Sequence, residues 1–188
     1  MPQAQTLSEA QLKRALTYCH SRRHARRDQT IILLTVYAGL RAKEVAALQC
    51  GTVYDTNGTV RDAFVMSGEQ TKGGRARTVY VSRKLARVLQ EYRADCASRA
   101  EHEPLFITQQ HSAFSANTMC QLMLDIYKGC GLVHASSHSG RRTFITRLAE
   151  QGVNVRLLAE LAGHSSITTT QRYIDANPAQ LARAVELV

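Results

Sequence analysis

Six side chains in this sequence have the chemistry needed to transfer a phosphoryl group, and each falls near an expected helix or strand boundary. They are Arg41, Lys72, His138, Arg141, His164 and Tyr173. Two arginines can each present a planar fork to the non-bridging oxygens of one phosphodiester, and histidines can donate further hydrogen bonds or accept a proton. A lysine in a glycine hairpin can reach a leaving oxygen as a general acid. A tyrosine, whose phenol has an ordinary pKa of about 10, can act as the nucleophile once it loses its proton.

Taken singly, these residues have ordinary explanations. Arg41 fits a charge on a helix surface, Lys72 fits a turn, and Tyr173 fits a core tyrosine. Carboxylates are scarce in the same segments, where only Glu44 and Asp175 occur, whereas a two-metal nuclease needs a cluster of them. The combination therefore favours metal-free phosphoryl transfer through a phosphotyrosine, and we expect no metal and no cofactor.

The charge of the chain indicates a polyanionic partner. Its 188 residues include 24 Lys and Arg against 15 Asp and Glu, which gives a net charge of +9. The densest basic stretch, at positions 21–27, contains Arg22, Arg23, Arg26 and Arg27. We expect these arginines to contact a DNA backbone and not the base edges. A solvated helix face is the alternative explanation for such a run.

Neither a membrane nor an export signal is indicated. The sequence contains no apolar run approaching the roughly 20 residues that a spanning helix needs, and its first residues lack the basic and then apolar pattern of a secretory signal. The five cysteines are odd in number and widely separated, which fits reduced thiols better than a disulfide framework. We expect a cytoplasmic, nucleoid-associated protein without a membrane partner.

Most of the chain has helical spacing. Ser8 and Gln11 form a capping box for a helix that ends near His20, with Leu7 placed to pack on Leu12. Further helices are expected at 26–38, 41–49, 83–100, 115–128, 139–151 and 154–162. A last helix should start at Asn177, with Pro178 in its first turn.

The middle of the chain changes to strand periodicity. Asn57-Gly58 between β-branched residues predicts a hairpin, and strands are expected at 63–67 and 77–82. Together these segments predict a three-stranded antiparallel sheet, with Lys72 in the loop between the last two strands. The predicted fold class is mainly α with a small antiparallel sheet, an α+β protein, arranged as a single domain over residues 1–188.

Three segments resemble the motifs of the tyrosine recombinases, the phage integrase family. AGLRAKEVAAL is similar to the first arginine motif, with Arg41 as the arginine and Glu44 as the accompanying acid. TKGGRARTVYV is similar to the β-hairpin lysine motif, with Lys72 followed by the basic residue Arg77. The third segment runs from His138 to Tyr173, and its last two matches, His164 and Tyr173, are separated by the expected nine residues.

This resemblance implies a role for each matched residue. Arg41, Arg141 and His164 would bind the scissile phosphate, His138 would act as a base or donor, Lys72 would protonate the leaving group, and Tyr173 would be the nucleophile. Glu44 and Arg77 would support the site. The implied activity is site-specific recombination or integration of DNA through a 3′-phosphotyrosine, which conserves the bond energy and needs neither metal nor ATP.

The resemblance also implies partners. Double-stranded DNA would be the substrate, four protomers would assemble on two DNA sites, and an accessory DNA-bending or directionality factor could take part. The last helix, from Asn177, would dock on a neighbouring protomer or pack in its own core. The family's N-terminal core-binding domain has no counterpart here, and neither does an arm-binding domain. Either the chain is a fragment, or it is a short member that acts alone.

The sequence departs from the family pattern beside the second arginine. Members commonly have Asp-Leu inside the HxxR motif and a histidine after it, whereas this chain has Ser139-Gly140 and Arg142. Arg142 is therefore a candidate for a contact with the DNA backbone. Two other functions are compatible with the residues: relaxation of DNA by a type IB topoisomerase, and DNA binding without catalysis. Neither the DNA target nor the biological role, as integrase, invertase, resolvase or transposon recombinase, follows from the sequence.

Overall fold

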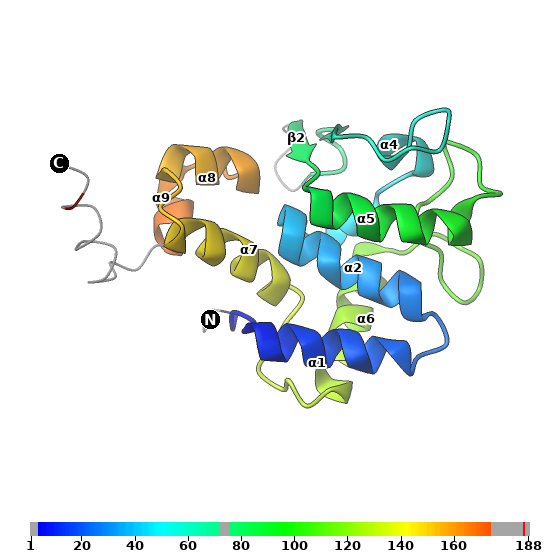
Figure 1. Ribbon diagram of the computed structural model, residues 1–188, viewed down its shortest axis with the longest axis horizontal. Helices are drawn as coiled ribbons and strands as arrows, with labels where there is room; N and C mark the ends of the chain where they lie inside the picture. Colours follow the sequence, from blue (N-terminus) through cyan, green and yellow to red (C-terminus); the bar gives the residue numbers. More distant parts are fainter. Residues whose placement is uncertain (1–3, 72–75, 174–185, 187–188) are drawn as a thin grey trace.

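Helices dominate the structure, as the α+β class requires. The computed structural model describes residues 4–71, 76–173 and 186. Its elements are α1 (Glu9–His20), α2 (Ala25–Ala38), α3 (Ala42–Ala46), α4 (Cys50–Val53), β1 (Ala63–Met66), β2 (Arg77–Tyr80), α5 (Arg83–Tyr92), the 3-10 helix η1 (Arg93–Cys96), α6 (Ala116–Gly129), α7 (Ser139–Glu150), α8 (Val155–Ala162) and α9 (Ile167–Gln171). In Figure 1, α7, α8 and α9 lie together on one side of α2, and α1 and α5 flank α2 along its length. The helix expected from Asn177 lies outside the described residues.

Local sequence sets the ends of the first two helices. The Ser8 side chain accepts from the Gln11 amide, and the Gln11 side chain accepts from the Ser8 amide, so the predicted capping box is confirmed. Helix α2 ends at Gly39, which adopts a left-handed conformation with φ of 63°. A Cβ at Gly39 would lie 2.5 Å from a ring carbon of Phe144. Glycine is therefore required there both by the backbone and by the packing of α7.

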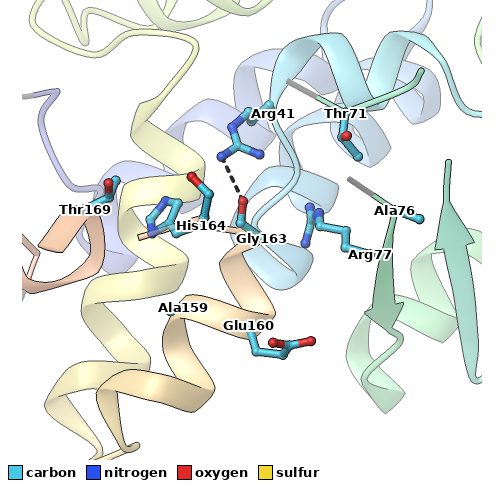
Figure 2. A pocket seen from close by; sticks show the side chains of 10 residues that line it. Arg41, Thr71, Ala76, Arg77, Ala159, Glu160, Gly163, His164 and Thr169 are labelled. Atoms are coloured by element: carbon cyan, nitrogen blue, oxygen red, sulfur yellow. Dashed lines mark hydrogen bonds between the residues drawn. The ribbon is translucent and has the colours of Figure 1, made fainter. Parts of the chain in front are cut away.

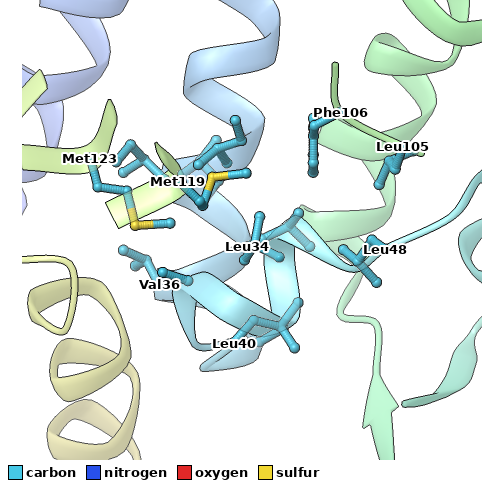
Figure 3. Packing of buried hydrophobic residues seen from close by; sticks show 14 of the residues in the cluster. Leu34, Val36, Leu40, Leu48, Leu105, Phe106, Met119 and Met123 are labelled. Carbon is cyan, nitrogen blue, oxygen red and sulfur yellow. The ribbon is translucent and has the colours of Figure 1, made fainter. Parts of the chain in front are cut away.

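The hydrophobic core lies between α2 and α6 and extends to the segment between η1 and α6. Figure 3 shows Met119 and Met123 of α6 facing Leu34 and Val36 of α2, with Leu105 and Phe106 on the other side of the cluster. All six of these side chains are buried. This core fixes α2, whose C-terminal end carries the turn into Arg41.

The sheet is smaller than the sequence predicted. In the described part of the chain it has two antiparallel strands, β1 and β2, with Met66 opposite Arg77 and Phe64 opposite Val79. The turn at Asn57-Gly58 forms, but only a single bridge, between Tyr54 and Val60, closes it. The prediction of a third strand is therefore wrong.

The reason for the missing strand is a contact that is distant in sequence. The amides of Cys50 and Gly51 donate to the carbonyls of Glu103 and Glu101 at 3.0 and 2.8 Å. These bonds satisfy amides that begin α4, so residues 50–53 form a helical turn, which includes the start of the segment 52–60 that was expected to form the hairpin. No helix in the described residues is long and apolar enough to cross a membrane.

Helix α7 packs closely on α2, and a glycine makes this possible. A Cβ at Gly140 would lie 1.9 Å from the Thr35 hydroxyl oxygen of α2. The neighbouring Ser139 is buried, and its hydroxyl accepts from the amide of Ser136 at 2.9 Å. Ser139 and Gly140 thus provide local support for the start of α7. They place the start of α7 against the end of α2.

Candidate active site

Three arginines meet at the C-terminal end of α8. Arg77 donates to the carbonyl of Leu161 at 2.7 Å, Arg41 donates to that of Gly163 at 3.4 Å, and Arg141 donates to that of Ala162. The arginines come from β2, from the N-cap of α3 and from α7. Three consecutive main-chain oxygens therefore hold three guanidinium groups together.

The geometry of the helix end explains why these oxygens are available. Gly163 ends α8 with φ of 61°. The amide of Gly163 donates to the main-chain carbonyl of Glu160, and the amide of His164 donates to that of Ala159, both at 2.9 Å. The next carbonyls along the chain have no amide partner within the helix, as is general at C-terminal ends. They carry the negative end of the helix dipole, which favours cations.

Glu44 links two of the three arginines. Its carboxylate is fully buried and accepts from the guanidinium of Arg41, from the Arg41 amide and from the guanidinium of Arg77, each at 2.8 Å. Burial pushes the pKa of Glu44 upward, but the charge of Arg77 and the bonds from Arg41 outweigh it and hold the pKa below its ordinary value. Glu44 is therefore ionised at neutral pH and fixes both side chains.

Arg141 is the most deeply buried of the three, with an exposed fraction of 4%. Besides the carbonyl of Ala162 it contacts that of Gly39, at 2.6 Å. Burial and then the charge of Arg41 lower the pKa of Arg141 to about 9. The group still carries its charge at pH 7, but among the described residues the cluster holds three guanidinium groups and one carboxylate, that of Glu44. An anion entering it would relieve the mutual repulsion of the cations.

His164 and Tyr173 lie together at the edge of this cluster. Their rings are stacked, with centroids 5.9 Å apart and planes 20° apart. Nδ1 of His164 is 2.8 Å from the hydroxyl of Thr170. Burial, followed by the charges of Arg141 and Arg41, lowers the pKa of His164 to about 4, so the ring is neutral at pH 7.

Arg142 contacts Tyr173 from another direction. Its guanidinium carbon lies 5.6 Å from the centroid of the Tyr173 ring, within the range of a cation–π contact. Its Nε is buried and has no hydrogen-bond partner among the described residues. Tyr173 is thus in contact with both His164 and Arg142.

A hollow of about 330 Å³ opens beside the arginines. Figure 2 shows Arg41, Arg77 and His164 converging around Gly163 at this hollow, with Thr71 and Ala76 on its far wall. Thr71 and Ala76 are the residues on either side of positions 72–75. The hollow is polar, and its charged lining residues are Arg41, Arg77 and Glu160, the last of which is exposed.

Two predicted catalytic residues, Lys72 and His138, remain to be placed. Lys72 lies outside the described residues. His138 is exposed and forms the N-cap of α7, three residues before Arg141, and it does not line the hollow. The structure therefore brings together Arg41, Arg141, His164 and Tyr173, with Glu44 and Arg77 as the groups that connect them.

Part of the basic stretch at 21–27 has a structural role. Arg27 is buried, pairs with Asp28 at 2.8 Å and donates to the carbonyl of Ile107 at 2.9 Å. Arg22 pairs with the same carboxylate of Asp28 at 2.7 Å. Both guanidinium groups are thus paired with one buried carboxylate, which gives Arg22 and Arg27 a structural role within the fold.

Position also separates the basic stretch from the site. Helix α2 has 14 residues, so about 20 Å lie between its start, beside Arg23 and Arg26, and the turn at Gly39. Arg23 is exposed, and Arg26 forms an exposed pair with Asp95 at 3.4 Å. Of the arginines expected to contact DNA, Arg142 alone lies beside Tyr173.

Sequence reasoning missed Thr170 and the carbonyls at the end of α8. Thr170 is the third residue of a threonine run, and only the phase of α9 distinguishes it from its neighbours. The carbonyls carry no side-chain signature at all. The glycine before His164 was the one available signal, because an αL glycine indicates a helix end with unpaired carbonyls.

Comparison with known proteins connects this geometry to a family. The sequence profile described as the phage integrase family matches residues 5–180. The tyrosine recombinase XerA of Pyrococcus horikoshii is 31% identical over 164 residues, which cover 85% of this chain and 54% of the relative. The tyrosine recombinase XerC of Pelobacter propionicus is 29% identical over 148 residues, which cover 78% of this chain and 47% of the relative. The chain thus spans about half the length of these curated relatives.

Solved structures share the fold. A crystal structure of a XerA recombinase superposes with a TM-score of 0.76 at 24% identity, covering 100% of this chain and 65% of the other. The integrase of transposon Tn1549, in complex with transposon right end DNA, gives a TM-score of 0.74 at 18% identity, covering 98% of this chain and 65% of the other. The predicted α+β recombinase fold is therefore confirmed.

Proposed function

The chain belongs to the phage integrase family, and on that premise we propose that it catalyses site-specific recombination of double-stranded DNA through a covalent 3′-phosphotyrosine. The observation that carries the proposal is the cation cluster at the end of α8. Arg41 and Arg77 pair with the carboxylate of Glu44, and Arg141 lies in the same cluster, beside the tyrosine that the family motif identifies as the nucleophile. A scissile phosphate would supply the missing negative charge.

The reaction would proceed by exchange of one phosphodiester for another. The phenol oxygen of Tyr173 attacks the phosphorus, a bond forms between them, and the bond from phosphorus to the 5′ oxygen breaks. The phenol proton leaves to a base, for which His138 is the candidate. The 5′ oxygen gains a proton, for which Lys72 is the candidate donor. Since the number of phosphoester bonds is unchanged, no ATP is needed to drive the step, and the guanidinium groups would supply the positive charge that a metal ion would otherwise provide.

The described residues would contribute mainly by electrostatic stabilisation. Arg41 and Arg141 would bind the non-bridging oxygens, on which charge accumulates in the transition state. His164, neutral at pH 7, would donate a hydrogen bond and not a full charge. Glu44 and Arg77 would keep Arg41 in place, because a prearranged donor needs no reorganisation during the reaction.

DNA is the proposed partner. The related Tn1549 integrase is described in complex with transposon right end DNA, and a XerH recombinase is described bound to its difH substrate. By analogy we propose that this chain binds DNA as four protomers on two sites, at the nucleoid, with an accessory bending or directionality factor where the element supplies one.

The test is covalent capture on nicked DNA. Duplexes drawn from the flanks of the encoding gene carry a nick close to the cleavage site, so that the short fragment bearing the free 5′-hydroxyl diffuses away after cleavage. The reaction is run in the presence of a chelator, and the adduct is then resolved on a denaturing gel. We expect an adduct with the natural protein and none with Tyr173→Phe, while both bind DNA equally. Tyr80→Phe is the matched control, because Tyr80 is exposed on β2.

The other outcomes select other functions. An adduct that survives in Tyr173→Phe would identify a different nucleophile and reject the mechanism. Relaxed circles without recombinants would favour a type IB topoisomerase. Salt-sensitive binding without any adduct would favour a DNA-binding module, because neutralisation of phosphates alone gives such binding.

A further inference from the structure

One threonine of the run at positions 168–170 differs from its neighbours. Thr168 and Thr169 are exposed, whereas Thr170 has an exposed fraction of 0%. Its hydroxyl lies 2.8 Å from Nδ1 of His164, and its carbonyl accepts from the amide of Tyr173 at 2.9 Å. Thr170 therefore connects the ring of one site residue to the main chain of another.

The direction of the hydrogen bond follows from what surrounds the hydroxyl. Among the described residues, Nδ1 of His164 is its only hydrogen-bond partner. If Nδ1 donated, the threonine proton would be buried without an acceptor, which is costly. If the hydroxyl donates, its proton is satisfied and Nδ1 is the unprotonated nitrogen. The ring is neutral at pH 7, since burial and the nearby arginines lower the pKa of His164 to about 4, so its single proton is then on Nε2.

We infer that Thr170 is a positioning residue whose hydroxyl donates to Nδ1 of His164 and so keeps the Nε2 proton available as a donor to a bound phosphate oxygen. The identity of the acceptor rests on the proposed function, whereas the tautomer of the ring does not. The inference extends to the nucleophile. Because Tyr173 stacks on the same ring and bonds to the main chain of the same threonine, one residue sets the relative placement of His164 and Tyr173.

The first test measures the tautomer directly. Long-range proton–nitrogen correlation spectra of protein labelled with ¹⁵N-histidine distinguish a protonated ring nitrogen from an unprotonated one, and a His164→Gln variant assigns the signal. We expect Nε2 protonated and Nδ1 unprotonated in the natural protein at pH 7, and the same in Thr170→Ser. Thr170→Val, which keeps the shape but removes the hydroxyl, should shift the ring toward the other tautomer. Thr168→Val is the matched control, because Thr168 is exposed and does not line the hollow, and it should leave the tautomer unchanged.

A protonated Nδ1 in the natural protein would overturn the inference, and so would a Thr170→Val spectrum identical to the natural one. If Thr170→Val fails to fold, the spectra of the natural protein and of Thr170→Ser still decide the tautomer. The stability of each variant is followed by its melting temperature, so that loss of fold is not mistaken for a change of tautomer.

The second test measures adduct formation on the nicked duplexes. Thr170→Val should slow it about tenfold or more, less than the roughly hundredfold or larger cost of deleting an oxyanion donor. Thr168→Val should retain the natural rate, and so should Thr170→Ser, which keeps the hydroxyl. Equal rates in Thr170→Val and the natural protein would refute the positioning role. If the natural protein forms no adduct but has the expected tautomer, the proposed function fails while the assignment of the hydrogen bond is supported.

Discussion

Replacing Glu44 with glutamine should destabilise the protein strongly, since this carboxylate joins two arginines in a buried position. Three donors reach its oxygens at 2.8 Å, two from Arg41 and one from Arg77. Glutamine keeps the volume and one acceptor oxygen, but its amide group turns a donor toward a guanidinium. Breaking a buried ion pair from one side costs about 3 to 5 kcal/mol. Because one acceptor remains, we expect about 3 kcal/mol, or a fall in melting temperature of about 6 to 12 °C for a chain of this size.

Thermal unfolding followed by circular dichroism measures this effect, and its pH dependence identifies the cause. The folded pKa of Glu44 is lowered, so its stabilisation is fully present above the unfolded pKa of about 4.3 and is lost as pH falls through the lower folded pKa. The difference in melting temperature between the natural protein and Glu44→Gln should therefore be constant near neutral pH and become smaller in acid. Glu160 is an exposed carboxylate at the same hollow, so Glu160→Gln should have the same melting temperature as the natural protein. A gap below about 2 °C at pH 7, or one that persists unchanged in acid, would refute the reasoning.

Two further predictions concern backbone strain and DNA contacts. Gly163→Ala should lower the free energy of unfolding by about 2 to 4 kcal/mol, because φ of Gly163 is positive and a Cβ would lie 2.4 Å from Cδ of Arg77. Gly152→Ala, with φ of 80° but nothing within 4 Å, should lower it by only about 1 kcal/mol in the same denaturant titration. Equal losses in the two variants would show that packing on Arg77 is unimportant. The double variant Arg23→Gln, Arg26→Gln should leave the salt dependence of DNA binding unchanged, whereas loss of two phosphate contacts would reduce the slope of log affinity against log salt concentration by about 2. A reduction of that size in a salt titration would show that these arginines do contact DNA.

Local signals in the sequence predicted the parts of the site that depend on helix ends. The capping box at Ser8 and the glycine stop at Gly39 act within a few residues, so they can be read from neighbouring positions. Arg41 follows directly from that stop, and the structure places it at the N-cap of α3 as expected. The period-2 pattern likewise predicted β2, in which Arg77 and Val79 are buried on the same face.

Features that depend on contacts distant in sequence were not predictable in this way. The expected third strand was lost because residues 101–103 supply acceptors to the start of α4. Arg27 was expected to contact DNA because its neighbours are basic, yet Asp28 and the carbonyl of Ile107 hold it inside the fold. Thr170 stands in a run of three threonines that the sequence does not distinguish, and the phase of α9 places its hydroxyl against His164.

The arginines at the end of α8 are held by main-chain oxygens, and this affects how the site can vary. A carbonyl is present whatever side chain the position carries, so substitutions at Leu161 and Ala162 leave the contacts to Arg77 and Arg141 chemically unchanged. Insertion or deletion of one residue within α8 would instead rotate its end by about 100° and misplace all three oxygens together. The site is therefore specified by the number of residues between Asn154 and Gly163 more than by their identity, and helix length is the property that selection would have to preserve.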